Sequence, residues 1–200
     1  MLGAVRTGSR STGNAAAALA LGCLLAALAP APAAAQDVAP GGFIHNVRGG
    51  VLAHDRGAFS SNTEDGIDIN LEIQFTEPDW AVWDYILSPR PILGGNINTV
   101  SDTSRGYAGL YWDYYPLDWL FVGGAFGATV HDGELDESEP ERRALGSRVL
   151  FHLALEVGVR FAEHHGLSLY ADHASNAGLI DDNESIEAAG VHYTFFFGGR

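Results

Sequence analysis

Residues 67–75 read Ile-Asp-Ile-Asn-Leu-Glu-Ile-Gln-Phe, a strict alternation of apolar and polar side chains. A period of two places the five apolar residues on one face of a β-strand and the four polar residues on the other. Residues 149–161 show the same alternation, with a polar face that includes His152, Glu156 and Arg160. About nine to eleven residues are enough to cross a bilayer as a tilted strand. The two stretches therefore predict a barrel wall with a lipid-facing side and a wet side.

Weaker alternation and the turn residues between the segments predict six further strands. They are expected at residues 43–53, 91–99, 105–115, 120–131, 167–175 and 186–197. Eight strands can close a small barrel, and closure removes the open sheet edges that hydrocarbon does not tolerate. We therefore predict an all-β fold, an eight-stranded antiparallel transmembrane β-barrel.

The main structural alternative is a soluble barrel that keeps its apolar side chains inside. Eight strands leave an interior only just wide enough for side chains, so such a barrel could not enclose the aliphatic faces of both strong strands. The last strand also ends in Tyr193-Thr194-Phe195-Phe196-Phe197, which resembles the aromatic C-terminal signature of bacterial outer-membrane barrels, although Gly198-Gly199-Arg200 follows it. Inside the barrel, Glu156 and Arg160 are expected to belong to a structural ion-pair network.

The connections are expected to alternate between the two sides of the membrane. With both termini in the periplasm, residues 116–118 and 163–166 form short periplasmic turns, and residues 131–146 and 176–185 form outer loops. Residues 77–89 are long for a periplasmic turn and contain two tryptophans and a tyrosine. This segment is expected to form an interfacial helical turn.

The first 35 residues have the pattern of a secretory signal peptide. Arg6 and Arg10 precede the apolar stretch 15–29, and Ala33-Ala34-Ala35 offers a cleavage site. Cleavage there would leave a mature barrel domain of residues 36–200 without cysteine, which excludes disulfides and thiolate chemistry. That domain keeps all 25 acidic residues and nine of the 11 arginines, a formal charge of −16. Nucleic acid is therefore excluded as an expected partner.

Three polar residues occupy the apolar parity of the last two strands. His173 and Ser175 continue the face of Leu167 and Leu169, and Glu187 shares the face of Val191. A nucleophile, a base and an acid are thus expected to project from adjacent strands onto one outer surface. In such a triad His173 takes the proton of Ser175, and Glu187 orients the imidazole and stabilises its charged form.

An oxyanion formed by this chemistry would need hydrogen-bond donors close to Ser175. Asn183 is the candidate in the following loop, with backbone N–H groups around Asn176 to Gly178 as further donors. Glu184 is a competing acid, but its position places it in the loop. Without Asn183 and Glu187, the histidine and serine would be read as ordinary interfacial polar residues.

The run His173-Ala174-Ser175-Asn176-Ala177-Gly178, followed by Asn183 and Glu187, resembles the H-x-S-N-A-G segment and the downstream Asn and Glu of the lipid A 3-O-deacylase (PagL-type) family. Arg90-Pro91, the run 96–98 and the run 109–112 also resemble that family, so the likeness covers most of the mature chain. It implies a serine esterase that removes the ester-linked 3-hydroxyacyl chain from position 3 of lipid A. It also implies that no metal or organic cofactor is needed, and that Asn176 and Gly178 help to position the substrate.

Two other functions stay open from the sequence. One is a non-catalytic outer-membrane barrel with a structural or binding role. Such a barrel would have no reason to keep three triad residues on the lipid-facing side of its strands. The other is an esterase that acts on phospholipids or other acylated lipids. The expected partners are lipid A, the outer membrane of a bacterial cell and, as an open alternative, a second copy of the chain in a homodimer.

Overall fold

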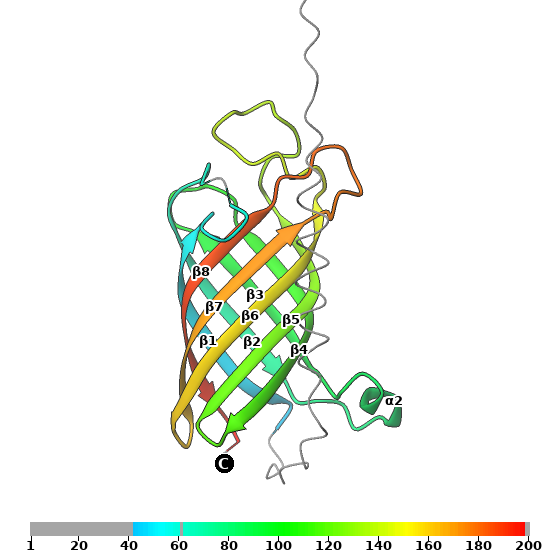
Figure 1. The fold of residues 1–200 in the computed structure, drawn as a ribbon, viewed down its shortest axis with the longest axis vertical. Helices are drawn as coiled ribbons and strands as arrows, with labels where there is room; N and C mark the ends of the chain where they lie inside the picture. The colour runs from blue at the N-terminus through cyan, green and yellow to red at the C-terminus, as the bar shows by residue number, and fades with distance from the viewer. Residues whose placement is uncertain (1–41, 61, 199–200) are drawn as a thin grey trace, which may run out of the picture.

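The computed structural model describes residues 42–60 and 62–198, which form a closed antiparallel β-barrel with strand order β1 to β8 (Figure 1). The strands are β1 (Ile44–His54), β2 (Ile67–Phe75), β3 (Arg90–Asn98), β4 (Arg105–Leu117), β5 (Leu120–His131), β6 (Val149–Ala162), β7 (His165–Ser175) and β8 (Ile186–Phe196). β1 pairs with β8, so neither end of the sheet is left as an open edge. The predicted signal peptide lies outside the described residues.

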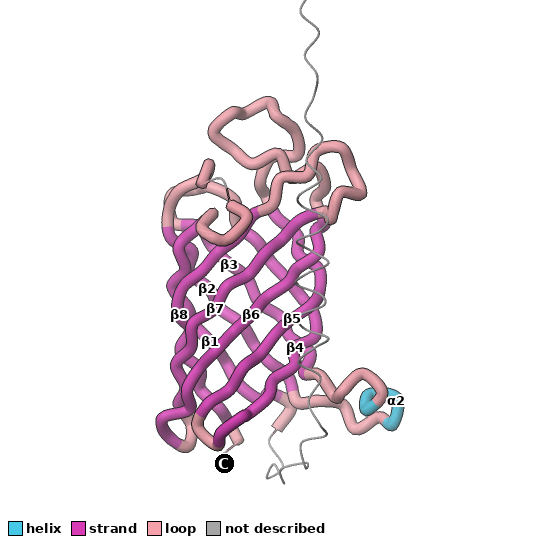
Figure 2. The backbone as a smooth tube through the Cα atoms, in the orientation of Figure 1, coloured by secondary structure: helices cyan, strands magenta, loops and turns pink. Residues whose placement is uncertain are grey.

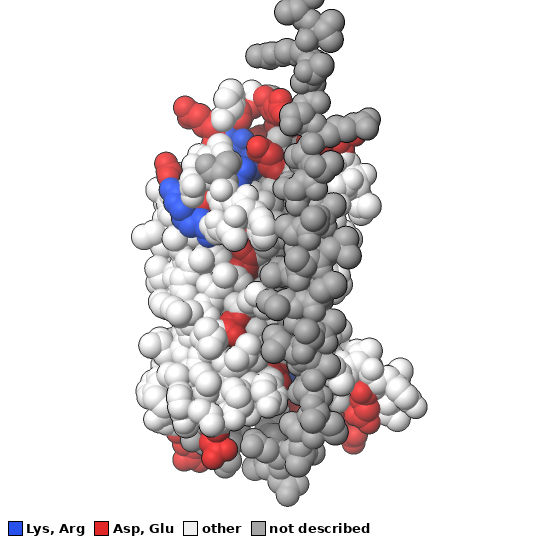
Figure 3. Space-filling model, viewed as in Figure 1, with Lys and Arg blue, Asp and Glu red and all other residues white. Residues whose placement is uncertain are grey.

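All eight strands lie where the alternation predicts them, with bounds that differ by no more than two residues. The eight-stranded transmembrane fold is therefore confirmed. The wall also has the predicted faces: Ile67, Ile69 and Leu71 are exposed, while Asp68 and Asn70 between them are buried. Figure 3 shows the consequence, an outer wall that is mostly uncharged between charged groups at its two ends.

The lumen is filled by polar and aromatic side chains that bind one another. The Glu156 carboxylate accepts hydrogen bonds from Arg48 at 2.5 Å, from the Tyr111 hydroxyl at 2.7 Å and from Ser168. Arg160, which we expected in the same network, donates to the backbone carbonyls of Glu163 and Gly198. These bonds join the end of β6 to the β6–β7 turn and to the residues that follow β8.

The two ends of the barrel differ (Figure 2). One end carries the long connections 55–66, 99–104, 132–148 and 176–185, and is here called the loop end. The other, the turn end, has tight β4–β5 and β6–β7 turns and the last residues of β8. The connection between β2 and β3 leaves this end sideways and contains α2 (Ala81–Asp84), which confirms the predicted helical turn. No helix in the described part of the chain is long and apolar enough to span a membrane.

Candidate active site

Three side chains at the loop end of β7 and β8 form one hydrogen-bonded chain. His173 stands opposite Glu187 in the β7–β8 register, and Ser175 lies two residues further along the same outward face. His173 Nδ1 is 2.8 Å from Glu187 Oε1, and His173 Nε2 is 3.0 Å from Ser175 Oγ. A carboxylate can only accept, so the Nδ1 hydrogen belongs to the bond with Glu187. Nε2 is then left as the acceptor for the Ser175 hydroxyl.

The three residues are on the outer face of the barrel, as the strand parity predicts, but two of them are covered. Glu187 is only 3% exposed and Ser175 9%, whereas the His173 side chain keeps 18% of its surface. From the parity of β7 and β8 alone, all three were expected on an open surface. The cover comes from loop residues that the local pattern of β7 and β8 does not reveal.

The β1–β2 loop provides the cover over Glu187. The Phe59 N–H donates to Glu187 Oε2 at 3.0 Å, so the two carboxylate oxygens bind the loop and His173 separately. The Phe59 ring also meets the His173 ring edge-on, with centroids 5.8 Å apart. A Cβ atom at Gly57 would lie 1.8 Å from Glu187 Oε2, so this position has no room for any side chain while the carboxylate keeps its place.

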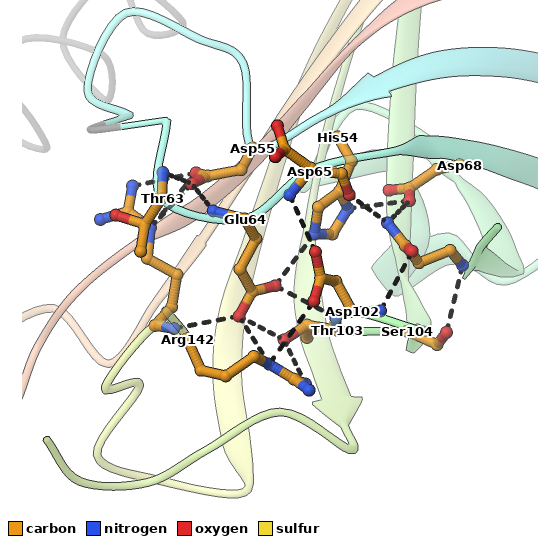
Figure 4. A network of polar contacts seen from close by, with 12 residues as sticks. His54, Asp55, Thr63, Glu64, Asp65, Asp68, Asp102, Thr103, Ser104 and Arg142 are labelled. Atoms are coloured by element: carbon orange, nitrogen blue, oxygen red, sulfur yellow. Dashed lines mark hydrogen bonds and ion pairs between the residues drawn. The ribbon is translucent and has the colours of Figure 1, made fainter. Parts of the chain in front are cut away.

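A buried polar network holds the β1–β2 loop against the other loops (Figure 4). Asp55 accepts from the Arg143 guanidinium at 2.9 Å and from the Thr63 N–H at 2.7 Å. Glu64 accepts from the Thr103 hydroxyl at 3.0 Å and from Arg142 at 3.3 Å. The network thus joins three separate connections of the loop end through fully paired charges.

The network lowers the pKa of the Glu64 carboxyl. Burial of its carboxyl acts to raise its pKa, but hydrogen bonds from His54, from the Arg143 N–H and from Thr103 outweigh it and lower the pKa to about 2. Glu64 is therefore ionised at neutral pH, and the loops depend on that charge.

The turn after Ser175 is shaped by two asparagines. The Asn176 N–H donates to Asn183 Oδ1 at 3.1 Å, and the Gly178 N–H donates to Asn176 Oδ1 at 2.9 Å. Ala177 and Gly178 both have positive φ angles, of 56° and 77°, so the chain reverses sharply here. Because Asn183 accepts through Oδ1, its Nδ2 group is the end of the amide that can donate to an oxyanion.

The structure thus brings together the predicted nucleophile, base and acid, with Asn176, Gly178 and Asn183 in the adjoining turn. The roles of the latter three toward substrate stay predictions, since two of the expected backbone donors already bind side-chain oxygens of the turn. Glu184 lies in the loop, as expected, and accepts from the Ala144 N–H at 2.8 Å. Among residues 42–60 and 62–198, no group of three or more His, Cys, Asp or Glu side chains is arranged to hold a metal ion.

Two residues of the site were missed by the sequence analysis. Phe59 and Gly57 lie in a connection without regular structure, and their contact with Glu187 spans 128 residues of sequence for the Phe59 bond. Gly57 and its two neighbours form the tripeptide Arg-Gly-Ala, which carries no local signal of a close approach.

Fold and site together define a class, a transmembrane β-barrel that carries a Ser–His–Glu arrangement on its outward face. Comparison with known proteins then identifies the family. A family model described as lipid A 3-O-deacylase (PagL) matches residues 70–196, more than half of the chain. The chain therefore belongs to the lipid A 3-O-deacylase (PagL) family, an ester hydrolase family, as the resemblance in its sequence indicates.

The fold is also similar to a solved structure described as the crystal structure of the outer membrane enzyme PagL. The two chains are 20% identical, with a TM-score of 0.57, and the match covers 75% of this chain and 98% of that one. A search of curated proteins gave no match. At this identity the structural likeness supports the barrel fold and nothing finer.

Proposed function

We propose that this lipid A 3-O-deacylase works by a Ser–His–Glu mechanism. His173 Nε2 takes the proton of Ser175 as Ser175 Oγ attacks the carbonyl carbon of the ester at position 3 of lipid A. The tetrahedral intermediate collapses, the sugar hydroxyl leaves with the proton from His173, and the 3-hydroxyacyl chain stays on Ser175. Water activated by the same histidine then releases the fatty acid.

Glu187 has two roles in this mechanism, and each of its carboxylate oxygens serves one of them. Oε1 accepts the Nδ1 hydrogen, which fixes the tautomer of His173 and stabilises the imidazolium that forms during each step. Oε2 accepts the Phe59 N–H, so the carboxylate cannot rotate away from the ring without losing that bond. Asn183 Nδ2 is proposed to donate to the oxyanion.

The position of the triad suits a substrate that is itself part of the membrane. The protein lies in the outer membrane, where its apolar outer wall faces lipid and its polar lumen is closed off. Ser175 lies on the lipid-facing parity, directly opposite the outward side chain of Phe151 in β6. We propose that the loop end points outward, so that an acyl ester of the outer leaflet reaches Ser175 sideways from the bilayer.

The unbroken hydrogen-bonded chain from Glu187 to Ser175 is the observation that carries this proposal. The direct test is mass spectrometry of lipid A from cells with and without the protein. The proposal expects the lipid A of producing cells to lose the mass of one 3-hydroxy fatty acid, with free hydroxyl at position 3. An unchanged lipid A spectrum in cells that contain folded barrel would favour a non-catalytic role.

Two further features stay predictions. The mature chain is proposed to begin at Gln36, which N-terminal sequencing of the membrane-inserted protein would check. A homodimer is the second, and cross-linking in intact membranes would detect it. Neither bears on the triad chemistry, because all three side chains come from one copy of the chain.

A further inference from the structure

The β2–β3 connection, residues 77–89, exposes several large apolar side chains that the barrel does not use. Tyr85 is 88% exposed, Val82 65% and Trp80 62%, and Ile86 and Leu87 are exposed as well. An apolar cluster of this kind on a folded protein marks a surface that contacts something else. Leu87 and Ser88 both have positive φ angles, of 67° and 45°, so the chain turns sharply between α2 and β3.

The segment is fixed to the barrel rather than loosely attached. The Trp112 indole N–H in β4 donates to the Ile86 carbonyl at 2.8 Å. Within the segment, the Trp83 indole N–H donates to the Pro89 carbonyl at 2.6 Å. At its base, Arg90 pairs with Glu77 at 3.3 Å and with Asp113 at 2.6 Å. These bonds therefore hold the apolar side chains at a fixed position along the barrel axis.

This position lies alongside the barrel wall and does not extend past the turn end. β3 begins opposite Tyr111, so β4 residues 112–117 extend further toward the turn end than β3 does. The segment contacts the start of this extension through the Trp112–Ile86 bond, and Tyr114, Leu117 and Trp119 further along it are also exposed. Figure 1 shows α2 projecting sideways from the wall, with the β4–β5 and β6–β7 turns reaching further down. Its apolar surface thus continues the lipid-facing belt outward.

We propose that residues 77–89 form a one-sided anchor that inserts into the headgroup region of the periplasmic phospholipid leaflet. Tryptophan and tyrosine favour this region because their rings are apolar and their N–H or O–H groups stay wet. The segment has three acidic residues and no basic one, so the attraction is apolar and suits zwitterionic phospholipid rather than anionic lipid. The anchor lies at the turn end, in the β2–β3 connection, whereas the triad lies at the loop end, on β7 and β8. An anchor there would set the tilt that presents Ser175 to the outer leaflet.

The experiment measures how deep a probe at Tyr85 lies in phosphatidylcholine vesicles. The chain has one cysteine, Cys23 in the predicted leader, so Tyr85→Cys in the mature chain can be labelled with a single environment-sensitive dye. Asp118→Cys, exposed in the β4–β5 turn, is the water control, and Ile69→Cys, exposed on the belt, is the bilayer control. Val82→Cys is a second probe of the segment, and heat-modifiable migration checks that each labelled variant is folded.

We expect iodide to quench the Tyr85 and Val82 probes several-fold less than the Asp118 probe. Lipid spin-labelled near the headgroup should quench them best, whereas lipid spin-labelled deep in the chain should quench the Ile69 probe best. Iodide quenching equal to that of Asp118, with Ile69 protected, would overturn the anchor and leave the membrane placement intact. Loss of protection on dilution with excess lipid would also overturn it, because a second copy of the chain would then be the partner. Iodide access to Ile69 as well would overturn both the anchor and the membrane placement on which it rests.

Discussion

The loop end of the barrel contains two histidine–carboxylate sites with nearly the same local geometry and different surroundings. His173 Nδ1 is 2.8 Å from Glu187, and His54 Nδ1 is 2.8 Å from Asp68. The difference lies at the other ring nitrogen. Nε2 of His173 meets the Ser175 hydroxyl on the outer face, whereas Nε2 of His54 meets a second carboxylate, Glu64, at 3.0 Å inside the barrel.

A histidine held by a carboxylate is therefore not enough to make a catalytic site. His54 is completely buried, and both of its ring nitrogens bind carboxylates. It therefore has no free nitrogen to accept a proton and no hydroxyl beside it to activate. His173 keeps part of its surface open and binds one acid and one hydroxyl. The His54 site stabilises the loops that cover the His173 site.

The largest difference is expected when each histidine is removed. His173→Ala should lower turnover of lipid A by ~10⁴ to 10⁶-fold in a folded barrel, because triad members act as a unit. His54→Ala should leave the turnover of the folded protein within about tenfold, but it should destabilise the barrel by roughly 3–5 kcal/mol, because two buried carboxylates lose their partner. Turnover and urea unfolding of both variants check this. Equal loss of turnover in both folded variants would remove the distinction between the two sites.

The next effect concerns the oxyanion donor of the His173 site. The buried His54 site has no residue with a corresponding role. Asn183→Ala should lower turnover by ~10² to 10³-fold. Asn183→Asp is the matched variant, since it keeps an acceptor for the Asn176 N–H and loses the Nδ2 donor. It should be at least as slow as the alanine variant. Wild-type turnover of Asn183→Asp would mean that the oxyanion is stabilised by other groups.

A smaller effect is expected at the contact that links the two regions, the Phe59 N–H. Phe59→Pro removes this donor to Glu187 and should lower turnover about tenfold, the scale of one hydrogen bond to a charged group. Phe59→Ala keeps the N–H and should be milder. The difference between them should vanish when Glu187 is alanine, because the contact then has no acceptor. A difference that persists in that background would show that the proline acts elsewhere.

The sequence predicts the outward strand faces that carry the His173 site, but it does not predict the loops that cover this site. The barrel and the outward parity of His173, Ser175 and Glu187 depend on a period of two within each strand, so local sequence determines them. The cover over Glu187 depends on contacts such as Asp55 with Arg143, which are 88 residues apart. No local pattern encodes a pairing of that kind, so the burial of Ser175 and Glu187 became visible only in the fold.

The smallest effect is the pH response of the loop network. The folded pKa of Glu64 lies at about 2, below its ordinary value near 4.5, so its charge stabilises the folded loops above pH 4.5. That contribution should fall as the pH drops from about 4.5 to 2, as the folded carboxyl takes up its proton. The protection of the β1–β2 loop amides, corrected for the intrinsic exchange rate at each pH, should fall across this window in the wild type. In Glu64→Gln this protection should be lower at neutral pH and change little across the window; an unchanged wild-type response in that variant would assign it to another group.

The central claim is that the outward site performs the chemistry through Ser175. The most direct measurement is the release of 3-hydroxy fatty acid from purified lipid A by Ser175→Ala, with heat-modifiable migration as the check of folding. The account predicts a folded barrel whose release is lowered by ~10⁴ to 10⁶-fold, and no further loss when His173→Ala is added. Full release by folded Ser175→Ala would contradict the account and require another nucleophile.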